Sequence, residues 1–133
     1  MAIDVDTVAT DADVDIELGG QLLAHVTLLP QDWTDIKAFR QRALDIATDA
    51  LKRRTPPIFE SDISDVTELR RAVVYGSCEK LYELALTNAA DGEVFHAKWM
   101  HYKAMFRREV ESLVITGPQS QRIVSRSPSI SRR

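Results

Sequence analysis

The sequence predicts an all-α fold: a three-helix antiparallel bundle with an extended N-terminal arm and an extended C-terminal tail. Three segments carry apolar residues mostly three or four positions apart, the period of an amphipathic helix. Short connections favour antiparallel neighbours. The N-terminal arm and the C-terminal tail do not show this helical spacing, and short β segments are possible within them. We therefore divide the chain into an acidic arm over 1–29, a helical domain over 30–115 and a basic Ser/Arg/Pro tail over 116–133.

The composition is that of one cytosolic domain. With 133 residues, a net charge of −3 and 44% hydrophobic residues, the chain suits a single core and is not basic enough for a general nucleic-acid binder. Its single cysteine, Cys78, cannot form an internal disulfide, which favours a reducing compartment. No apolar run reaches the ~18 residues of a membrane span. Acids stand where a secretory signal needs bases, so no leader is expected.

The acidic arm alternates acidic and apolar side chains. The stretch DADVDIEL at 11–18 has period 2, Gly19-Gly20 follows, and apolar residues alternate again from Leu22 to Leu28. Period 2 on both sides of a Gly-Gly pair predicts two extended stretches, which a hairpin would join. Both are too short to be stable alone.

The first long helix is predicted over 32–54. Its apolar residues recur at helical spacing, and its length would be ~34 Å at ~1.5 Å per residue. Gln31 or Asp32 would open it. The cations in its last turn suit the negative end of the helix dipole, and Pro56-Pro57 end it.

The second helix is predicted over 65–88. Asp65, followed three residues later by Glu68, resembles a capping box. Most of the helix circumference is apolar, which predicts a central position with neighbours on several sides. Gly76 in its middle costs ~1 kcal/mol relative to alanine, so we expect another backbone to approach closely there.

The third helix, over 92–114, has the clearest apolar spacing, from Phe95 to Leu113. A short connection from Asn88 to Gly92 makes it the antiparallel partner of the second helix. The residues expected to form the core are Trp33, Leu44, Val73, Leu81, Phe95, Trp99, Tyr102 and Phe106.

No catalytic, cofactor-binding or metal-binding residues are predicted, and an enzyme is not expected. Asp11, Asp13 and Asp15 resemble the start of an EF-hand loop. Its sixth and twelfth positions are Ile16 and Leu22 instead of glycine and glutamate, so a solvated acidic strand face is the better interpretation.

Other reactive or ligand-binding side chains also have plain structural interpretations. His96 and His101 are five positions apart, not the four that align two imidazoles on a helix. Cys78 lies among apolar neighbours and is expected to be buried and unreactive. Trp99, Tyr102 and Phe106 could belong to a base-stacking platform, but aromatic residues at helical spacing more often form a core.

Charge is divided between the two ends. The first 17 residues hold six acids and no base, and the last twelve hold four arginines and no acid. In a homo-oligomer the acidic arm of one subunit could meet the basic tail of the next. Two solvated, disordered ends are the alternative. The predicted inter-subunit acidic residues are Asp11, Asp13, Asp15 and Glu17. The predicted partner-binding residues of the tail are Arg122, Ile123, Val124, Arg126, Ile130, Arg132 and Arg133.

The run RRTPPIFESDISDVTELRRAVVYGSCEKLYELAL, followed by NAADGEVFHAKWMHYKAMFRREVESL, resembles the head–tail connector (adaptor) proteins of long-tailed double-stranded DNA bacteriophages. The similarity lies in the layout. A first helix ends in basic residues and a Pro-containing loop, a second carries Leu-Arg-Arg-Ala-x-x-Tyr, and a third carries Trp, Tyr and Phe near Arg-Arg-Glu. The resemblance covers about residues 30–115. It extends to the tail through its Ser/Arg/Pro composition, but it does not include the acidic first thirty residues.

The resemblance implies a structural adaptor that assembles as a ring, expected to be a dodecamer, beneath the portal protein. It would extend the DNA channel without sequence-specific DNA binding and would dock the next neck or tail component. Its place would be the virion, at the capsid–tail junction, after assembly in the host cytoplasm. Residues 118–133 would reach onto the portal. The alternative is a small helical DNA-binding regulator that uses the arginines of the tail on phosphates. No cofactor or membrane is expected.

Overall fold

The computed structural model describes four stretches of the chain: residues 3–29, 35–86, 92–117 and 122–123. Almost all regular structure within them is helical, so the predicted all-α class is confirmed. None of the helices in these ranges combines the length and the hydrophobicity that a membrane span requires.

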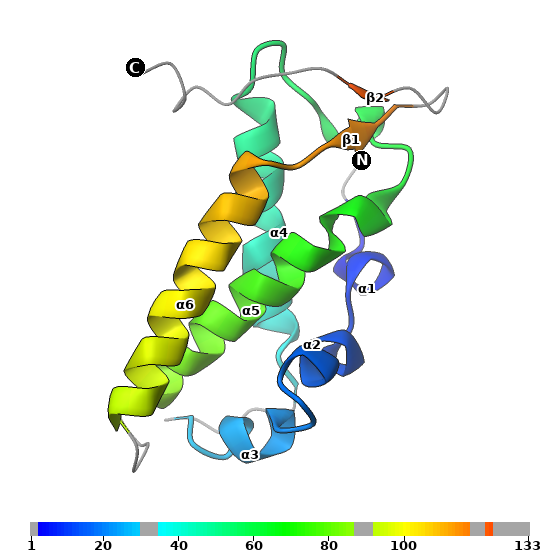
Figure 1. Cartoon of the computed structure of the whole chain (residues 1–133). Helices are drawn as coiled ribbons and strands as arrows, with labels where there is room; N and C mark the ends of the chain where they lie inside the picture. The colour runs from blue at the N-terminus through cyan, green and yellow to red at the C-terminus, as the bar shows by residue number, and fades with distance from the viewer. Residues whose placement is uncertain (1–2, 30–34, 87–91, 118–121, 124–133) are drawn as a thin grey trace, which may run out of the picture.

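The long helices are α4 (Lys37–Lys52), α5 (Arg70–Ala85) and α6 (Gly92–Glu111). α5 lies between the other two and packs against both, whereas α4 and α6 contact each other sparsely (Figure 1). All of them begin within the predicted ranges and end two or three residues earlier than expected. The proposed start at Gln31 or Asp32 lies outside the described residues. So does the predicted connection from Asn88 to Gly92, except for Gly92, which begins α6.

The start of α5 differs from the predicted capping box. A short 3-10 helix, η2 (Val66–Leu69), precedes α5, and Asp65 caps it by accepting a hydrogen bond from the Thr67 N–H at 3.0 Å. Glu68 does not complete a box. Its carboxylate accepts from the backbone N–H of Thr116 at 2.8 Å and from the Thr116 hydroxyl at 2.7 Å. The capping-box prediction is wrong because a distant residue offers Glu68 two donors.

The acidic arm is not extended, and the predicted hairpin is wrong. The chain instead forms α1 (Val5–Val8), α2 (Asp11–Glu17) and α3 (Leu22–Val26). Thr10 and Asp13 make a reciprocal capping box at the start of α2. Gly19 and Gly20 adopt φ values of +65° and +84°, which end α2 in the left-handed conformation and do not turn a hairpin.

These short helices pack onto the long ones. α1 contacts α4 and η2, while α2 and α3 contact α5 (Figure 1). The fully buried side chains of Val5, Val8 and Val14 belong to the same core as Leu44 of α4 and Leu81 of α5. Helical packing wins over alternation because Val14 and Leu18 are four positions apart and bury one face of α2.

The C-terminal part contains the expected short β structure. β1 (Ile115–Thr116) pairs with β2 (Arg122–Ile123) in an antiparallel ribbon that places Ile115 opposite Ile123. Ile115 is fully buried, and Ile123 is partly buried against the core. Arg54, at the end of α4, donates to the carbonyls of Val110, Glu111 and Leu113 and so caps the C-terminus of α6.

The predicted core is largely confirmed. Five of the eight residues are buried: Leu44, Val73, Leu81, Tyr102 and Phe106. Phe95 and Trp99 are only partly buried, and Trp33 lies outside the described residues.

Gly76 is closely approached, but by side chains and not by the backbone that the sequence analysis predicts. A Cβ added at Gly76 would lie 2.6 Å from the Cβ of Ala43 and 2.9 Å from the ring of Phe106. Side chains of α4 and α6 therefore both contact α5 at Gly76, and α5 forms the base of the space between α4 and α6.

Candidate interaction surface

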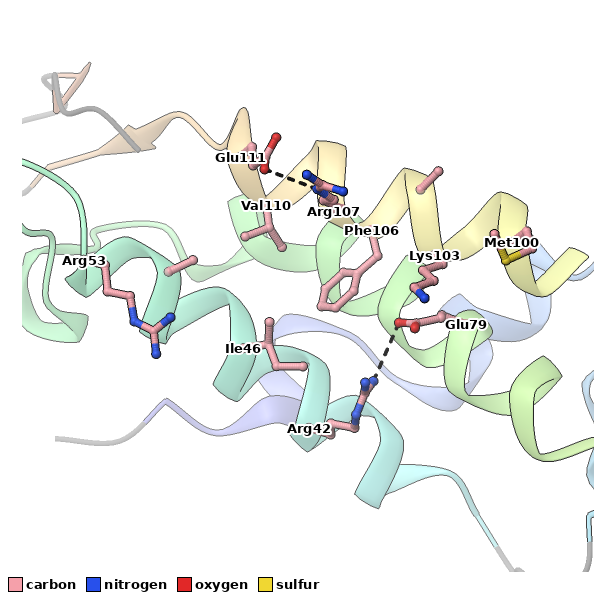
Figure 2. A pocket seen from close by; sticks show the side chains of 12 residues that line it. Arg42, Ile46, Arg53, Glu79, Met100, Lys103, Phe106, Arg107, Val110 and Glu111 are labelled. Atoms are coloured by element: carbon pink, nitrogen blue, oxygen red, sulfur yellow. Dashed lines mark ion pairs between the residues drawn. The ribbon is translucent and has the colours of Figure 1, made fainter. Parts of the chain in front are cut away.

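A groove of about 580 Å³ lies between α4 and α6, with α5 at its base (Figure 2). It exists because both helices pack on α5 but contact each other sparsely. The side chains of Ile46, Phe106 and Val110 point into it (Figure 2). The residues that line this α4–α6 groove are Arg42, Ile46, Ala50, Arg53, Glu79, Met100, Lys103, Ala104, Phe106, Arg107, Val110 and Glu111.

Large apolar side chains in the groove are open to solvent. Ile46 on α4 is 38% exposed, and Met100 on α6 is 47% exposed. Ala104, one turn from Met100, is also exposed. These residues form an apolar strip on the inner walls, and on α6 this strip lies across the helix from the buried side chain of Tyr102. The groove therefore offers exposed apolar contact area on both of its walls.

The base of the groove holds a loosely paired ion pair. Arg42 Nη1 lies 3.8 Å from Glu79 Oε1 (Figure 2) and has no hydrogen-bond partner among the described residues. The side chain of Glu79 is only 10% exposed. Burial raises the pKa of Glu79, and the positive charge of Arg42 opposes that rise. Because Arg42 and Glu79 are 3.8 Å apart, they do not form a strong charge-assisted hydrogen bond.

The rim of the groove is positive. Arg107 pairs with Glu111 at 3.5 Å on an exposed part of α6 (Figure 2), and the Lys103 ammonium lies 5.2 Å from the centre of the Trp99 ring. Arg53 extends from the end of α4 (Figure 2). Four cations against two carboxylates leave the lining with an excess of positive charge. The sequence alone did not identify this groove, because it depends on how far α4 and α6 diverge.

The predicted acidic residues all make contacts within the chain. Asp11 accepts from Arg40 Nε at 2.8 Å, and Asp13 from the Thr10 N–H at 2.8 Å. Asp15 accepts from the Leu22 N–H at 3.0 Å. Glu17 accepts from the Tyr102 hydroxyl at 3.0 Å. An inter-subunit role for these four acids stays a prediction.

Arg40 is the centre of the acidic contacts, and the sequence analysis missed it. The residue is 4% exposed and donates to Asp6 at 2.7 Å, to Asp11 at 2.8 Å and to the Ala9 carbonyl at 2.9 Å. Burial alone would lower the pKa of Arg40, but the two carboxylates more than offset it and raise the pKa. A signal existed: Arg40 falls on the apolar stripe of α4, between Ile36 and Ala43, where a cation needs buried partners.

The predicted tail residues are mostly beyond the described stretches. Arg122 and Ile123 form β2. The other five lie outside the described residues: Val124, Arg126, Ile130, Arg132 and Arg133. Their role in partner binding stays a prediction.

His96 and His101 are exposed, and Cys78 belongs to the core, as their sequence interpretations expect. No group of three metal-ligating side chains occurs in the part of the chain that is described. Cys78 is fully buried, and burial raises the pKa of its thiol. His25 Nε2 lies 3.1 Å from the Tyr82 hydroxyl, whose pKa burial raises to about 12. Tyr102 stacks on Tyr82 with ring centres 5.8 Å apart, as a core aromatic residue.

Known proteins supply no relative for comparison. No protein-family model, no curated protein and no solved structure matches the chain. The α4–α6 groove combines exposed apolar side chains with excess positive charge.

Proposed function

We propose that this chain is a structural adaptor at the capsid–tail junction of a long-tailed double-stranded DNA bacteriophage. It would form a ring, expected to be a dodecamer, beneath the portal protein, extend the DNA channel and dock the next neck or tail component. Its core would be a three-helix antiparallel bundle of α4, α5 and α6. The proposal is supported by the resemblance of residues 30–115 to connector proteins and by the helical architecture.

The observation that carries the proposal is the α4–α6 groove. Protein interfaces combine an apolar centre with a charged rim, and arginine, methionine and aromatic residues are enriched in them. The groove has this composition, with Met100 and Ile46 exposed on its walls and Arg53 and Arg107 among the charged residues of its lining. A chain that works by contact with other proteins needs such a surface, whereas an enzyme needs a cluster of reactive groups.

The overall charge also suits a protein around a DNA channel. With a net charge of −3, the chain lacks the excess of cations that makes a protein hold duplex DNA tightly. DNA could then pass through a ring without being retained. The arginines of the tail would bind an acidic surface of the portal protein.

The test uses emptied capsids that carry the portal. Full-length protein should co-sediment with them, and protein lacking residues 118–133 should keep its helical circular dichroism but fail to co-sediment. Capsids without a portal are the control and should not bind the full-length chain. If the full-length protein ignores portal-bearing capsids, or if the tail-less protein binds them normally, the adaptor proposal or its tail assignment is wrong.

A DNA-binding regulator is the second candidate. The observation that favours it is the set of cations on the open side of α6, including Lys103 and Arg107, together with the four tail arginines. It requires duplex binding that weakens steeply with salt and that falls when Arg122, Arg126, Arg132 and Arg133 are replaced by alanine. An adaptor should show no such binding near physiological salt.

A further inference from the structure

We propose that the α4–α6 groove receives the exposed side of α2 and α3 from a second copy of this chain. We call this side the α2–α3 ridge and define it by the exposed side chains of Ile16 and Leu23 and the acids Asp15 and Glu17. Ile16 and Glu17 lie on one flank of the ridge, and Asp15 and Leu23 lie on the other. The inference rests on the proposed assembly function and deepens it, because it names the partner of one surface. It concerns contact between copies, not contact with the portal.

The ridge presents apolar side chains that nothing in the described part of its own chain covers. Ile16 is 78% exposed and Leu23 is 77% exposed, the two highest values among the exposed large hydrophobic residues. Val14, two positions from Ile16 on α2, is fully buried. α2 therefore has one apolar face inside the protein and a second apolar contact point outside it.

The charges of the two surfaces are complementary. On the ridge, Asp15 and Glu17 accept hydrogen bonds from neutral groups, the Leu22 N–H and the Tyr102 hydroxyl, so neither negative charge is offset by an ion pair among the described residues. The lining of the groove contains Arg42, Arg53, Lys103 and Arg107 against two glutamates. Because the ridge and the groove carry opposite charge around apolar centres, contact would bury the apolar side chains and pair the charges at the rim.

The dimensions are also compatible. The groove wall on α4 runs from Arg42 to Arg53, which is about 16 Å along a helix at ~1.5 Å per residue. α2 has seven residues and is ~10 Å long on the same scale. The short helix therefore fits within the length of the groove.

The ridge of a chain does not face the groove of that same chain. α2 contacts one flank of α6, where Glu17 accepts a hydrogen bond from Tyr102 at 3.0 Å. The groove opens on the other flank of α6, along Lys103 and Arg107. Contact between two different surfaces is heterologous, and a heterologous contact closes into a ring when its rotation allows. A ring is what the proposed function requires.

The experiment is sedimentation velocity on the full-length chain and on three single variants, each checked by circular dichroism. Met100→Glu places a carboxylate in the apolar strip of the groove, and Ile16→Glu places one on the ridge. Val114→Glu is the control, because Val114 is 48% exposed and belongs to neither surface. We expect wild-type and Val114→Glu proteins to self-associate equally, and the other two to associate at least about tenfold more weakly.

A mixture of the Met100→Glu and Ile16→Glu proteins distinguishes a heterologous contact from a contact between two identical surfaces. Met100→Glu keeps an intact ridge, and Ile16→Glu keeps an intact groove, so the mixture should form a one-to-one dimer and nothing larger. A chain that stays monomeric at high micromolar concentration overturns the inference. So does a mixture without a heterodimer, or a groove or ridge variant that assembles like the control. If either variant loses its helical signal, Ile46→Glu and Leu23→Glu replace them at the same surfaces.

Failure of this inference is distinguishable from failure of the proposed function. A monomeric chain that still joins portal-bearing capsids contradicts only the ridge-and-groove contact. A chain that self-associates through these surfaces but ignores such capsids contradicts only the adaptor function. If Met100→Glu self-associates like wild type but no longer joins portal-bearing capsids, the groove serves another protein and the inference is wrong.

Discussion

The N-terminal helices and the α4–α6 groove are both charged and apolar, but they use their charges differently. In α1 and α2 the acids have partners within the chain, and two of them enclose the buried Arg40. In the groove, Arg42 is loosely paired, and the rim keeps an excess of cations. The comparison teaches that charge gathered at one end of a sequence does not identify the surface left for a partner. What identifies it is the charge and apolar area that remain after folding.

The largest effect should come from placing a valine side chain at a position in the core and at a position in the groove. Gly76→Val places a branched side chain where even a Cβ would lie 2.6 Å from Ala43, and we expect a loss of about 3 kcal/mol in the free energy of unfolding. Ala104→Val, at the exposed wall of the groove, should change it by less than about 0.5 kcal/mol. Urea denaturation measures both. Equal losses of unfolding free energy for Gly76→Val and Ala104→Val would mean that the space at Ala104 is already filled in the free chain.

The next effect compares two arginines on α4. Arg40→Met leaves Asp6 and Asp11 without their buried cation and should lower the free energy of unfolding by about 2 kcal/mol, less than for a fully buried pair because both acids are partly exposed. Arg42→Met removes a pair that is 3.8 Å apart and should lower it by less than about 0.5 kcal/mol. Thermal unfolding at neutral pH tests the difference. A greater loss for Arg42→Met would contradict it.

A smaller difference is expected between two neighbouring positions of α2. Val14→Ala removes two methyl groups from a fully buried side chain, and we expect a loss of about 1.5 kcal/mol in the free energy of unfolding. Ile16→Ala, at a side chain that is 78% exposed, should cost less than about 0.5 kcal/mol. Urea denaturation of the dilute chain is the measurement. Equal small effects at both positions would show that α2 is not packed on the core.

The smallest effect is a difference in pH dependence between Asp6 and Glu79. Hydrogen bonding to Arg40 lowers the pKa of Asp6, so its stabilising effect is present at neutral pH and is lost as the pH falls through its folded-state pKa. Burial raises the pKa of Glu79, so its ionisation destabilises the fold as the pH rises through its folded-state pKa. Asp6→Asn should therefore lower stability at pH 7, whereas Glu79→Gln should raise it. Both differences should shrink in acid, and urea titrations at several pH values can detect a reversed sign.

The long helices were predictable because apolar spacing over sixteen or more residues outweighs local ambiguity. The N-terminal helices were not, because over eight residues period 2 and period 3.6 share positions such as Val14 and Leu18. The sequence nevertheless held a clue in Thr10, which stands three residues before Asp13 as in the capping box that forms. The alternation of acidic and apolar residues nevertheless favoured extended strands over a helix at this segment.

The candidate site was less predictable than the fold. The predicted site residues lay at the two ends of the chain, whereas the groove is built from the middle of α4 and the outer flank of α6. Met100 and Ile46 look like ordinary core residues in the sequence, and only the divergence of two helices leaves them exposed. Arg40 could have been found, since a cation on an apolar stripe needs nearby acids.

The most direct test of the central claim is hydrogen exchange at the amides of α2 in the dilute, full-length chain. The claim is that the acidic N-terminal segment is folded onto the long helices of its own chain and does not wait for a partner to order it. The Leu18 amide, which donates to the Val14 carbonyl at 3.0 Å, should then exchange orders of magnitude more slowly than in an unstructured peptide. Exchange at the rate of an unstructured peptide, in a chain whose α5 amides are protected, would contradict it.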